Sequence, residues 1–286
     1  MLQPEGGIGL KFVKMHGIGN DYVYVDCFRN PAPSDPEEAA RRVSQSHFGI
    51  GADGLILIMP STQSGMDARM RMFNADGSEG SMCGNGIRCV GKYLYDSGLC
   101  NKRRIAVETL SGARYLDMVV EGDKAVAARV DMGAPGLEPE DLPVRCEKGE
   151  MRNLQVAGRS FTCVSMGNPH AVCLDGGLTD GEVLKIGPQV ENSPLFPEKV
   201  NVEFAQVLSP SRVRMRVWER GSGETMACGT GACATLVAGV LSGRCERRAT
   251  LELLGGELFI EWDEKDNHVY MTGPAETVFE GEFFGL

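Results

Sequence analysis

The chain has 286 residues, of which 42% are hydrophobic and 24% are charged, and its formal net charge at pH 7 is -10. These values are typical of a globular protein of about two domains, and an acidic chain without a lysine or arginine run argues against a nucleic-acid partner. No apolar stretch approaches the roughly 18 residues of a membrane span and the N-terminus lacks a signal-peptide pattern, so we expect a cytoplasmic protein without membrane contact.

The first half of the chain alternates short strands with helical stretches. Residues 23–26 (VYVD) and 55–60 (LILIMP) are rich in β-formers, and 69–73 (RMRMF) alternates basic and apolar residues as a half-exposed strand does. Residues 36–48 are predicted to be helical. The intervening GIGADG at 49–54 matches the dinucleotide fingerprint G-x-G-x-x-G, but it follows a helix and precedes a strand, the reverse of what that fingerprint needs. We therefore expect no nicotinamide or flavin site.

Two helices are predicted to begin directly after a cysteine. Residues 84–98 (GNGIRCVGKYLYDSG) follow Cys83, and residues 229–243 (GTGACATLVAGVLSG) follow Cys228; each stretch ends in a glycine, a common helix stop. The basic and apolar alternation also recurs at 212–218 (RVRMRVW). Each half thus reads as a strand, a loop carrying a cysteine, and a helix.

The two halves are copies of one another. An offset of 145 residues aligns 69–86 with 214–231 without a gap, and the matching residues include both cysteines and the glycines that follow them. A looser match sets GNDYVYVD beside GNPHAVCLD. We predict an α+β fold of two pseudo-symmetric domains from an internal duplication, each a curved mixed sheet around a principal helix, with the boundary near Arg129.

A cysteine at a helix start lies at the positive end of the helix dipole, which lowers a thiol pKa. The following glycines let a ligand approach the free N–H groups, which can cradle a carboxylate. A carbon held between two such loops has one thiol on each face, so a thiolate can remove a proton while the other thiol delivers one. This pattern predicts a cofactor-independent racemase or epimerase acting beside a carboxylate, with Cys83 and Cys228 as the acid/base pair.

The remaining cysteines are predicted to be free thiols with a packing role. There is no C-x-x-C pair, and the four histidines have no zinc-ligand spacing, so we expect no metal site. The packing cysteines are Cys27, Cys89, Cys100, Cys146, Cys163, Cys173, Cys233 and Cys245.

The sequence resembles the diaminopimelate epimerase family, which interconverts LL- and meso-diaminopimelate on the route to lysine and cell wall. The resembling segments, running from Lys14 to Ala234, are KMHGIGNDYVYVD, GIGADGLI, FNADGSEGSMCGNGIRC, VSMGNPHAV, VNVEFAQV and WERGSGETMACGTGACA. The resemblance implies an isomerase that needs no pyridoxal phosphate and a homodimer. It also implies that the last strand returns to the first domain, giving domains of residues 1–128 with 274–286 and of residues 129–273.

The resemblance further implies a set of site residues. Gly84, Asn85, Gly229 and Thr230 would cradle the reacting carboxylate, and His170 and Glu219 would tune the cysteines. Glu219 and Arg220 would also hold the ammonium and carboxylate of the distal end. The implied substrate contacts are Asn20, Asn74, Asn168, Asn201, Glu219 and Arg220. In one departure, several family members carry Gln where this chain has Gly54, so any side-chain contact there is lost.

Two other functions compete with this one. A proline or hydroxyproline racemase acts on a compact ring, which leaves the Glu219 and Arg220 pair without a distal group to hold. A redox sensor or binding protein would use the two cysteines as a switch and would need no distal amino-acid site.

Overall fold

The computed structural model describes residues 9–175 and 178–286. The chain folds as two compact units. One ends at Val130 and includes the C-terminal stretch Pro274–Leu286, and the other is Asp131–Gly273. Within the described residues, no helix is both long and apolar enough to cross a membrane.

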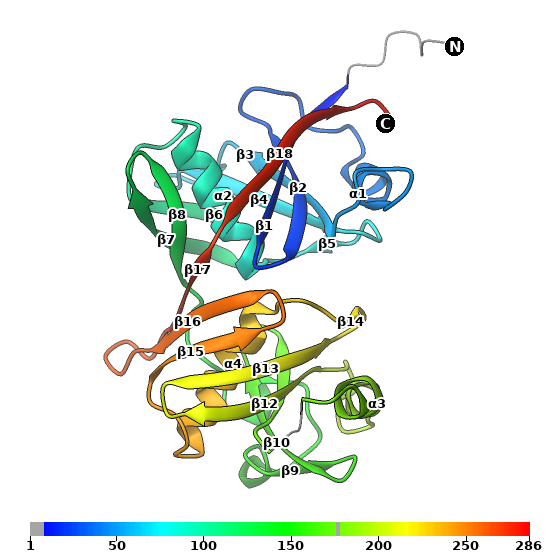
Figure 1. Cartoon of the computed structure of the whole chain (residues 1–286), viewed down its shortest axis with the longest axis vertical. Coiled ribbons are helices and arrows are strands. Elements are labelled where there is room, and N and C mark those ends of the chain that lie inside the picture. Colours follow the sequence, from blue (N-terminus) through cyan, green and yellow to red (C-terminus); the bar gives the residue numbers. More distant parts are fainter. Residues whose placement is uncertain (1–8, 176–177) are drawn as a thin grey trace. The chain divides into compact units, whose positions relative to one another are not determined.

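The first unit contains one mixed sheet (Figure 1). Its strands pair in the order β18-β1-β2-β3-β4-β6-β7-β8, with β2–β3 and β4–β6 parallel and the other pairs antiparallel. A short β5 (Glu79–Gly80) pairs with β4. The strands are β1 (Leu10–Gly17), β2 (Asn20–Asp26), β3 (Gly54–Met59), β4 (Ala68–Asn74), β6 (Arg104–Thr109), β7 (Gly112–Glu121), β8 (Lys124–Asp131) and β18 (Glu276–Phe283).

The second unit repeats this arrangement. Its strands pair in the order β9-β10-β11-β12-β13-β15-β16-β17, with β11–β12 and β13–β15 parallel. A short β14 (Gly223–Glu224) pairs with β13, as β5 pairs with β4. The strands are β9 (Leu154–Val156), β10 (Arg159–Ser165), β11 (Pro169–Cys173), β12 (Asn201–Ser209), β13 (Arg212–Glu219), β15 (Arg248–Leu253), β16 (Gly256–Trp262) and β17 (Val269–Pro274). The matching strand orders confirm the predicted α+β fold of two related halves.

One largely buried helix packs against the sheet of each unit. These are α2 (Gly84–Asp96) and α4 (Gly229–Leu241), which confirm the two predicted helices. Each begins after its cysteine, and after each helix Gly98 and Gly243 adopt positive φ angles of 74° and 70°. That left-handed conformation is where a helix commonly ends on glycine.

A second helix in each unit closes a further part of the core. The predicted α1 (Pro36–Ser44) packs against β3 and buries Val43. Helix α3 (Asp180–Glu191) was not predicted, and it buries Val183 and Val190 in a cluster with Phe161 and Phe204. Two single-turn 3-10 helices, Pro139–Asp141 and Lys148–Glu150, lie in the Pro- and Gly-rich stretch that opens the second unit.

The cysteines are all free thiols, as predicted. Among the eight expected to pack in the core, Cys89, Cys100, Cys163, Cys173 and Cys233 are buried. Cys27, Cys146 and Cys245 are half-buried.

Candidate active site

Cys83 caps the first turn of α2 through its sulfur. The Gly86 N–H donates to Cys83 Sγ at 3.3 Å, so the thiol occupies the N-cap position usually held by an oxygen. The thiol in turn donates to Asn20 Oδ1 at 3.3 Å. Asn20 begins β2, so the turn between β1 and β2 places its amide over the helix start.

Asn20 is itself held in place by a carboxylate. Its Nδ2 donates to Asp53 Oδ2 at 2.6 Å, and the same oxygen accepts the Asp21 N–H at 3.0 Å. Burial raises the pKa of Asp53 and raises the pKa of the neighbouring Tyr22 well above its usual value. The negative charge of a Cys83 thiolate would raise the pKa of Tyr22 further. Cys83 itself is half-buried and lies beside these hydrogen-bonded groups.

The side chain of Asn85 is bound from within the protein. Its Nδ2 donates to Asn20 Oδ1 at 3.3 Å, and its Oδ1 accepts from Arg88 Nη1 at 3.0 Å. Arg88 is fully buried and also bonds the Gly84 and Pro274 carbonyls. With the Asn85 amide bound this way, the groups that face a ligand here are the backbone N–H groups of the helix start.

Cys228 caps α4 in the same manner but is more deeply buried, at 5% exposure. Gly231 N–H donates to its sulfur at 3.4 Å, and Thr230 Oγ1 lies 3.5 Å from it. Burial raises the pKa of the Cys228 thiol well above its usual value, and the charges of Glu219 and Glu203 raise it further. The expectation that the helix dipole lowers the pKa is therefore wrong for Cys228, because loss of solvent outweighs the dipole.

His170 is fully buried, with no solvent exposure. Its Nδ1 is 2.7 Å from Glu203 Oε1, and its Nε2 is 3.0 Å from Asn168 Oδ1. The Asn168 Nδ2 donates to Thr230 Oγ1 at 3.3 Å. A hydrogen-bonded series thus leads from a buried carboxylate to the residue beside the thiol.

Glu219 ends β13 and lies beside Cys228. The charge of its carboxylate raises the pKa of the Cys228 thiol, the Thr225 hydroxyl donates a hydrogen bond to this carboxylate, and burial raises the pKa of the Glu219 carboxyl. The Arg220 side chain bonds a different part of the chain, because its Nη1 donates to the Glu198 carbonyl at 3.2 Å. This position supports the tuning role of Glu219 more directly than its expected role at a distal ammonium.

Two of the implied substrate asparagines have structural partners. Asn74 Nδ2 donates to Ser78 Oγ at 3.0 Å within the turn after β4. Asn201 is 4% exposed; its Nδ2 donates to the Pro169 carbonyl at 2.9 Å and its Oδ1 accepts the Arg220 N–H at 2.9 Å. The implied residues that gather at the thiols are Asn20, Gly84 and Asn85 at Cys83, and Asn168, His170, Glu219, Gly229 and Thr230 at Cys228.

Sequence reasoning missed several polar residues of both sites. Asp53 lies in the rejected GIGADG segment, and Tyr22 lies in β2 just before the predicted strand at 23–26. Glu203 carried a usable signal, because it is a charged residue inside the apolar strand VNVEFAQV. A charge at such a position is rarely buried without a partner.

The surroundings of residue 54 account for the glycine that this chain has where several family members carry glutamine. A Cβ built on Gly54 would lie 2.1 Å from the Phe73 carbonyl oxygen and 2.9 Å from Tyr22 Cε1. A glutamine therefore does not fit at residue 54 unless the β3 and β4 backbones separate.

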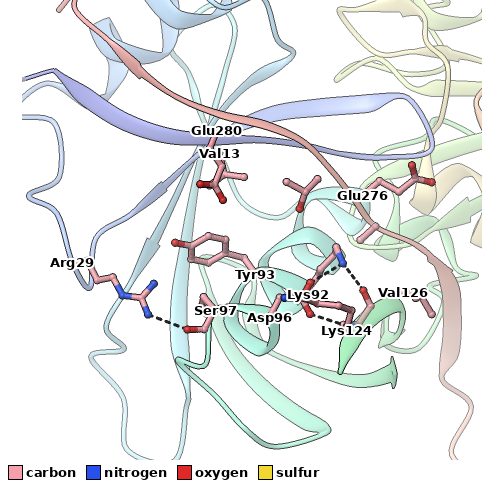
Figure 2. Close-up of a pocket in the computed structure, with 13 residues that line it drawn as sticks. Val13, Arg29, Lys92, Tyr93, Asp96, Ser97, Lys124, Val126, Glu276 and Glu280 are labelled. Carbon is pink, nitrogen blue, oxygen red and sulfur yellow. Dashed lines mark hydrogen bonds and ion pairs between the residues drawn. The ribbon is translucent and has the colours of Figure 1, made fainter. Parts of the chain in front are cut away.

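A cavity of about 780 Å³ lies elsewhere in the first unit (Figure 2). It is lined by the C-terminal half of α2, whereas Cys83 precedes the N-terminus of that helix. Two of its cations bind protein partners: Lys92 bonds Asp96 at 2.8 Å, and Arg29 donates to the Ser97 carbonyl at 3.0 Å. Across residues 9–175 and 178–286, no cluster of three metal-ligating side chains occurs.

Comparison with known proteins gives a consistent result. The sequence model of the family described as diaminopimelate epimerase matches residues 12–138 and 162–278. A diaminopimelate epimerase of Acetivibrio thermocellus is 56% identical over 277 residues, covering 96% of this chain and 98% of the relative. One of Methanococcus maripaludis strain C5 is 54% identical over 277 residues, covering 96% and 99%. A solved probable proline racemase from Agrobacterium radiobacter K84 has the same fold, with a TM-score of 0.71 at 16% identity over 95% of this chain and 92% of that one.

Proposed function

This chain belongs to the diaminopimelate epimerase family, and we propose on that premise that it interconverts LL- and meso-diaminopimelate by moving one proton at an α-carbon. The observation that carries the mechanism is the repeated geometry of Cys83 and Cys228. Each sulfur caps a helix start, and the glycines of that first turn carry no side chain that would keep a carboxylate from approaching the backbone N–H groups. No pyridoxal phosphate or metal is needed for this chemistry.

In the mechanism, one cysteine acts as a thiolate base and the other as a thiol acid. The base removes the α-proton, and the acid delivers its own proton to the opposite face of the same carbon. The N–H groups at Gly84, Asn85, Gly229 and Thr230 stabilise the charge that develops on the substrate carboxylate. Such donors are typically worth about 100- to 1000-fold in rate each.

The surroundings of Cys228 favour its protonated form at rest. Burial and the nearby Glu219 carboxylate oppose the thiolate. Cys228 therefore starts as the acid when Cys83 starts as the base, and the roles reverse in the opposite direction of the reaction. Glu219 is the nearby carboxylate whose charge tunes the pKa of this thiol.

The distal end of the substrate is assigned to the remaining polar residues. The proposed contacts are Asn20, Asn74, Asn168, Asn201, Glu219 and Arg220, of which Arg220 is exposed and carries the cation that a distal carboxylate needs. The two epimerase domains remain predicted as residues 1–128 with 274–286 and residues 129–273. A homodimer, a cytoplasmic location and a place in lysine biosynthesis also remain predictions.

The test is a stereochemical assay of the reduced protein with LL-diaminopimelate. We expect meso product from the wild type, loss of activity in Cys83→Ser and Cys228→Ser, and retained activity in Cys245→Ser, a half-buried cysteine outside both sites. L-Proline is offered in parallel. Turnover of proline and not of diaminopimelate would replace the proposal with a proline-type racemase.

A further inference from the structure

Glu203 and His170 form a pair of titratable side chains inside the core of the second unit. Both side chains have no solvent exposure, and among the described residues Glu203 Oε2 has no hydrogen-bond partner. Burying a carboxylate is costly unless the charge is compensated. The compensation here is the imidazole at 2.7 Å from Glu203 Oε1.

The fold itself does not require a charge at this position. His170 corresponds to Tyr22 in the repeat, because the two follow the matched pairs Gly167-Asn168 and Gly19-Asn20. Two residues further along, Val172 pairs with Glu203 across β11 and β12. The corresponding residue of β2 pairs with Ile56 across β3. Ile56 is therefore the counterpart of Glu203.

The packing under the two helices confirms this correspondence. A Cβ built on Gly86 of α2 would lie 2.6 Å from Ile56 Cδ1, and a Cβ built on Gly231 of α4 would lie 2.6 Å from Glu203 Oε1. Both side chains thus press against the helix turn that the cysteine caps. One half of the protein fills this space with an isoleucine, so the carboxylate in the other half serves something other than packing.

Glu203 is connected to the Cys228 sulfur by four contacts. They run from Glu203 to His170 (2.7 Å), from His170 to Asn168 (3.0 Å), from Asn168 to Thr230 (3.3 Å) and from Thr230 to Cys228 (3.5 Å). The first and second contacts place an oxygen acceptor at each ring nitrogen of His170. An imidazole satisfies two acceptors only when both nitrogens carry protons.

The direction of this series follows from that protonation. With His170 doubly protonated, Nε2–H donates to Asn168 Oδ1, the Asn168 amide donates to Thr230 Oγ1, and the Thr230 hydroxyl is left to donate to Cys228 Sγ. With His170 neutral, the amide must turn over, and the series then accepts a hydrogen bond from the thiol instead. The first arrangement favours a thiolate and the second a thiol.

We propose that Glu203 is a positioning residue for Cys228: it holds His170 doubly protonated, and through Asn168 and Thr230 it turns a hydroxyl donor toward the Cys228 sulfur. The inference rests on the proposed function in one respect, that Cys228 passes through a thiolate during turnover. The hydrogen bond from the Thr230 hydroxyl then offsets the effect of burial, which opposes this thiolate. The Cys83 half has no such pair, since Ile56 occupies the equivalent place.

A purely electrostatic role for Glu203 predicts a shift of the Cys228 pKa in the opposite direction when Glu203 is removed. The titratable groups around the Cys228 sulfur are His170 on β11, Glu203 on β12 and Glu219 on β13, and the Gly231 N–H of α4 also faces it. If Glu203 acted on the sulfur only through its negative charge, removing that charge would make the thiolate easier to form. If it acts through His170, removing it makes the thiolate harder to form.

The test measures the pH dependence of Cys228 alkylation by iodoacetamide, read by peptide mass spectrometry without substrate. We expect Glu203→Gln to move the midpoint upward by about one pH unit, a roughly 10-fold slower reaction at fixed pH below the midpoint, because the thiolate loses the hydrogen bond that the Thr230 hydroxyl donates to it. Thr230→Val should produce a shift of the same sign. Glu191→Gln, which changes a buried carboxylate of α3 bonded to Trp218, should leave the midpoint unchanged.

A downward shift or an unchanged midpoint in Glu203→Gln would overturn the inference. If Glu203→Gln does not fold, the direction of the midpoint shift is measured in two other variants. They are Glu203→Ile, which copies the residue of the other half, and Thr230→Val. The outcome is independent of the proposed function, because alkylation needs no substrate. A wild type that alkylates as expected but does not epimerise diaminopimelate would refute the proposed function alone.

Discussion

Replacing Asn201 by alanine should lower stability as well as activity. The side chain is 4% exposed and joins two backbone groups, the Pro169 carbonyl and the Arg220 N–H, at 2.9 Å each. The Pro169 carbonyl is buried, and leaving it unbonded costs about 1–3 kcal/mol. The Arg220 N–H lies nearer to solvent, so its loss adds only about 0.5–1.5 kcal/mol. We predict that the free energy of unfolding falls by about 2–4 kcal/mol.

The assay is urea denaturation followed by circular dichroism, with Asn74→Ala as the matched control. Asn74 is also an implied substrate contact, but its amide bonds only Ser78 in a solvent-accessible turn, so its loss should change stability by less than about 0.5 kcal/mol. An Asn201→Ala variant with an unchanged unfolding midpoint and a large loss of kcat/KM would refute this reasoning, because the amide would then serve the substrate and not the backbone.

Three further predictions concern the thiols and one glycine. Cys83→Ser and Cys228→Ser should each lower kcat/KM by about 100- to 10,000-fold with an unchanged circular dichroism spectrum, and near-normal turnover in either variant would count against acid/base roles for the thiols. Burial raises the pKa of Cys89 to about 11 and of Cys163 to about 12, so above about pH 9 the unfolded chain holds fewer protons than the folded one. The free energy of unfolding should therefore fall by up to about 1.4 kcal/mol per pH unit for each thiol, and Cys163→Ala should reduce this slope in urea titrations at pH 8 to 11; a slope equal to that of the wild type would contradict the assignment. Gly54→Gln should lower stability by about 1–3 kcal/mol because its Cβ meets the Phe73 carbonyl at 2.1 Å, and an unchanged melting temperature would show that the strands separate freely.

The repeat and its two principal helices could be predicted because their signals are local. The cysteine-glycine starts and the glycines after each helix lie within a few residues of the elements they define. Helix α3 gave no such signal, since Gly181, Gly187 and Pro188 are poor helix formers. It is stabilised by tertiary packing: Gly187 lies so close to Trp218 that a Cβ there would be 2.8 Å away.

The chemistry around the thiols was only partly predictable. The cysteines themselves follow from the repeated motif, but the sign of the Cys228 pKa shift depends on burial, which sequence position does not reveal. Glu203 comes to its site from the neighbouring strand β12 and Asp53 from the loop before β3, each through a contact with a residue 33 positions away in the chain. Such long-range pairs depend on strand register and cannot be derived from local pattern.

The most direct test of the two-thiol mechanism is the early time course in heavy water with LL-diaminopimelate. If one cysteine removes the proton and the other delivers a solvent-derived one, the first meso product carries deuterium at the inverted α-carbon while unreacted LL substrate keeps its proton. Meso product that retains the original proton would instead show that a single group moves the proton between faces, and would contradict the paired roles of Cys83 and Cys228.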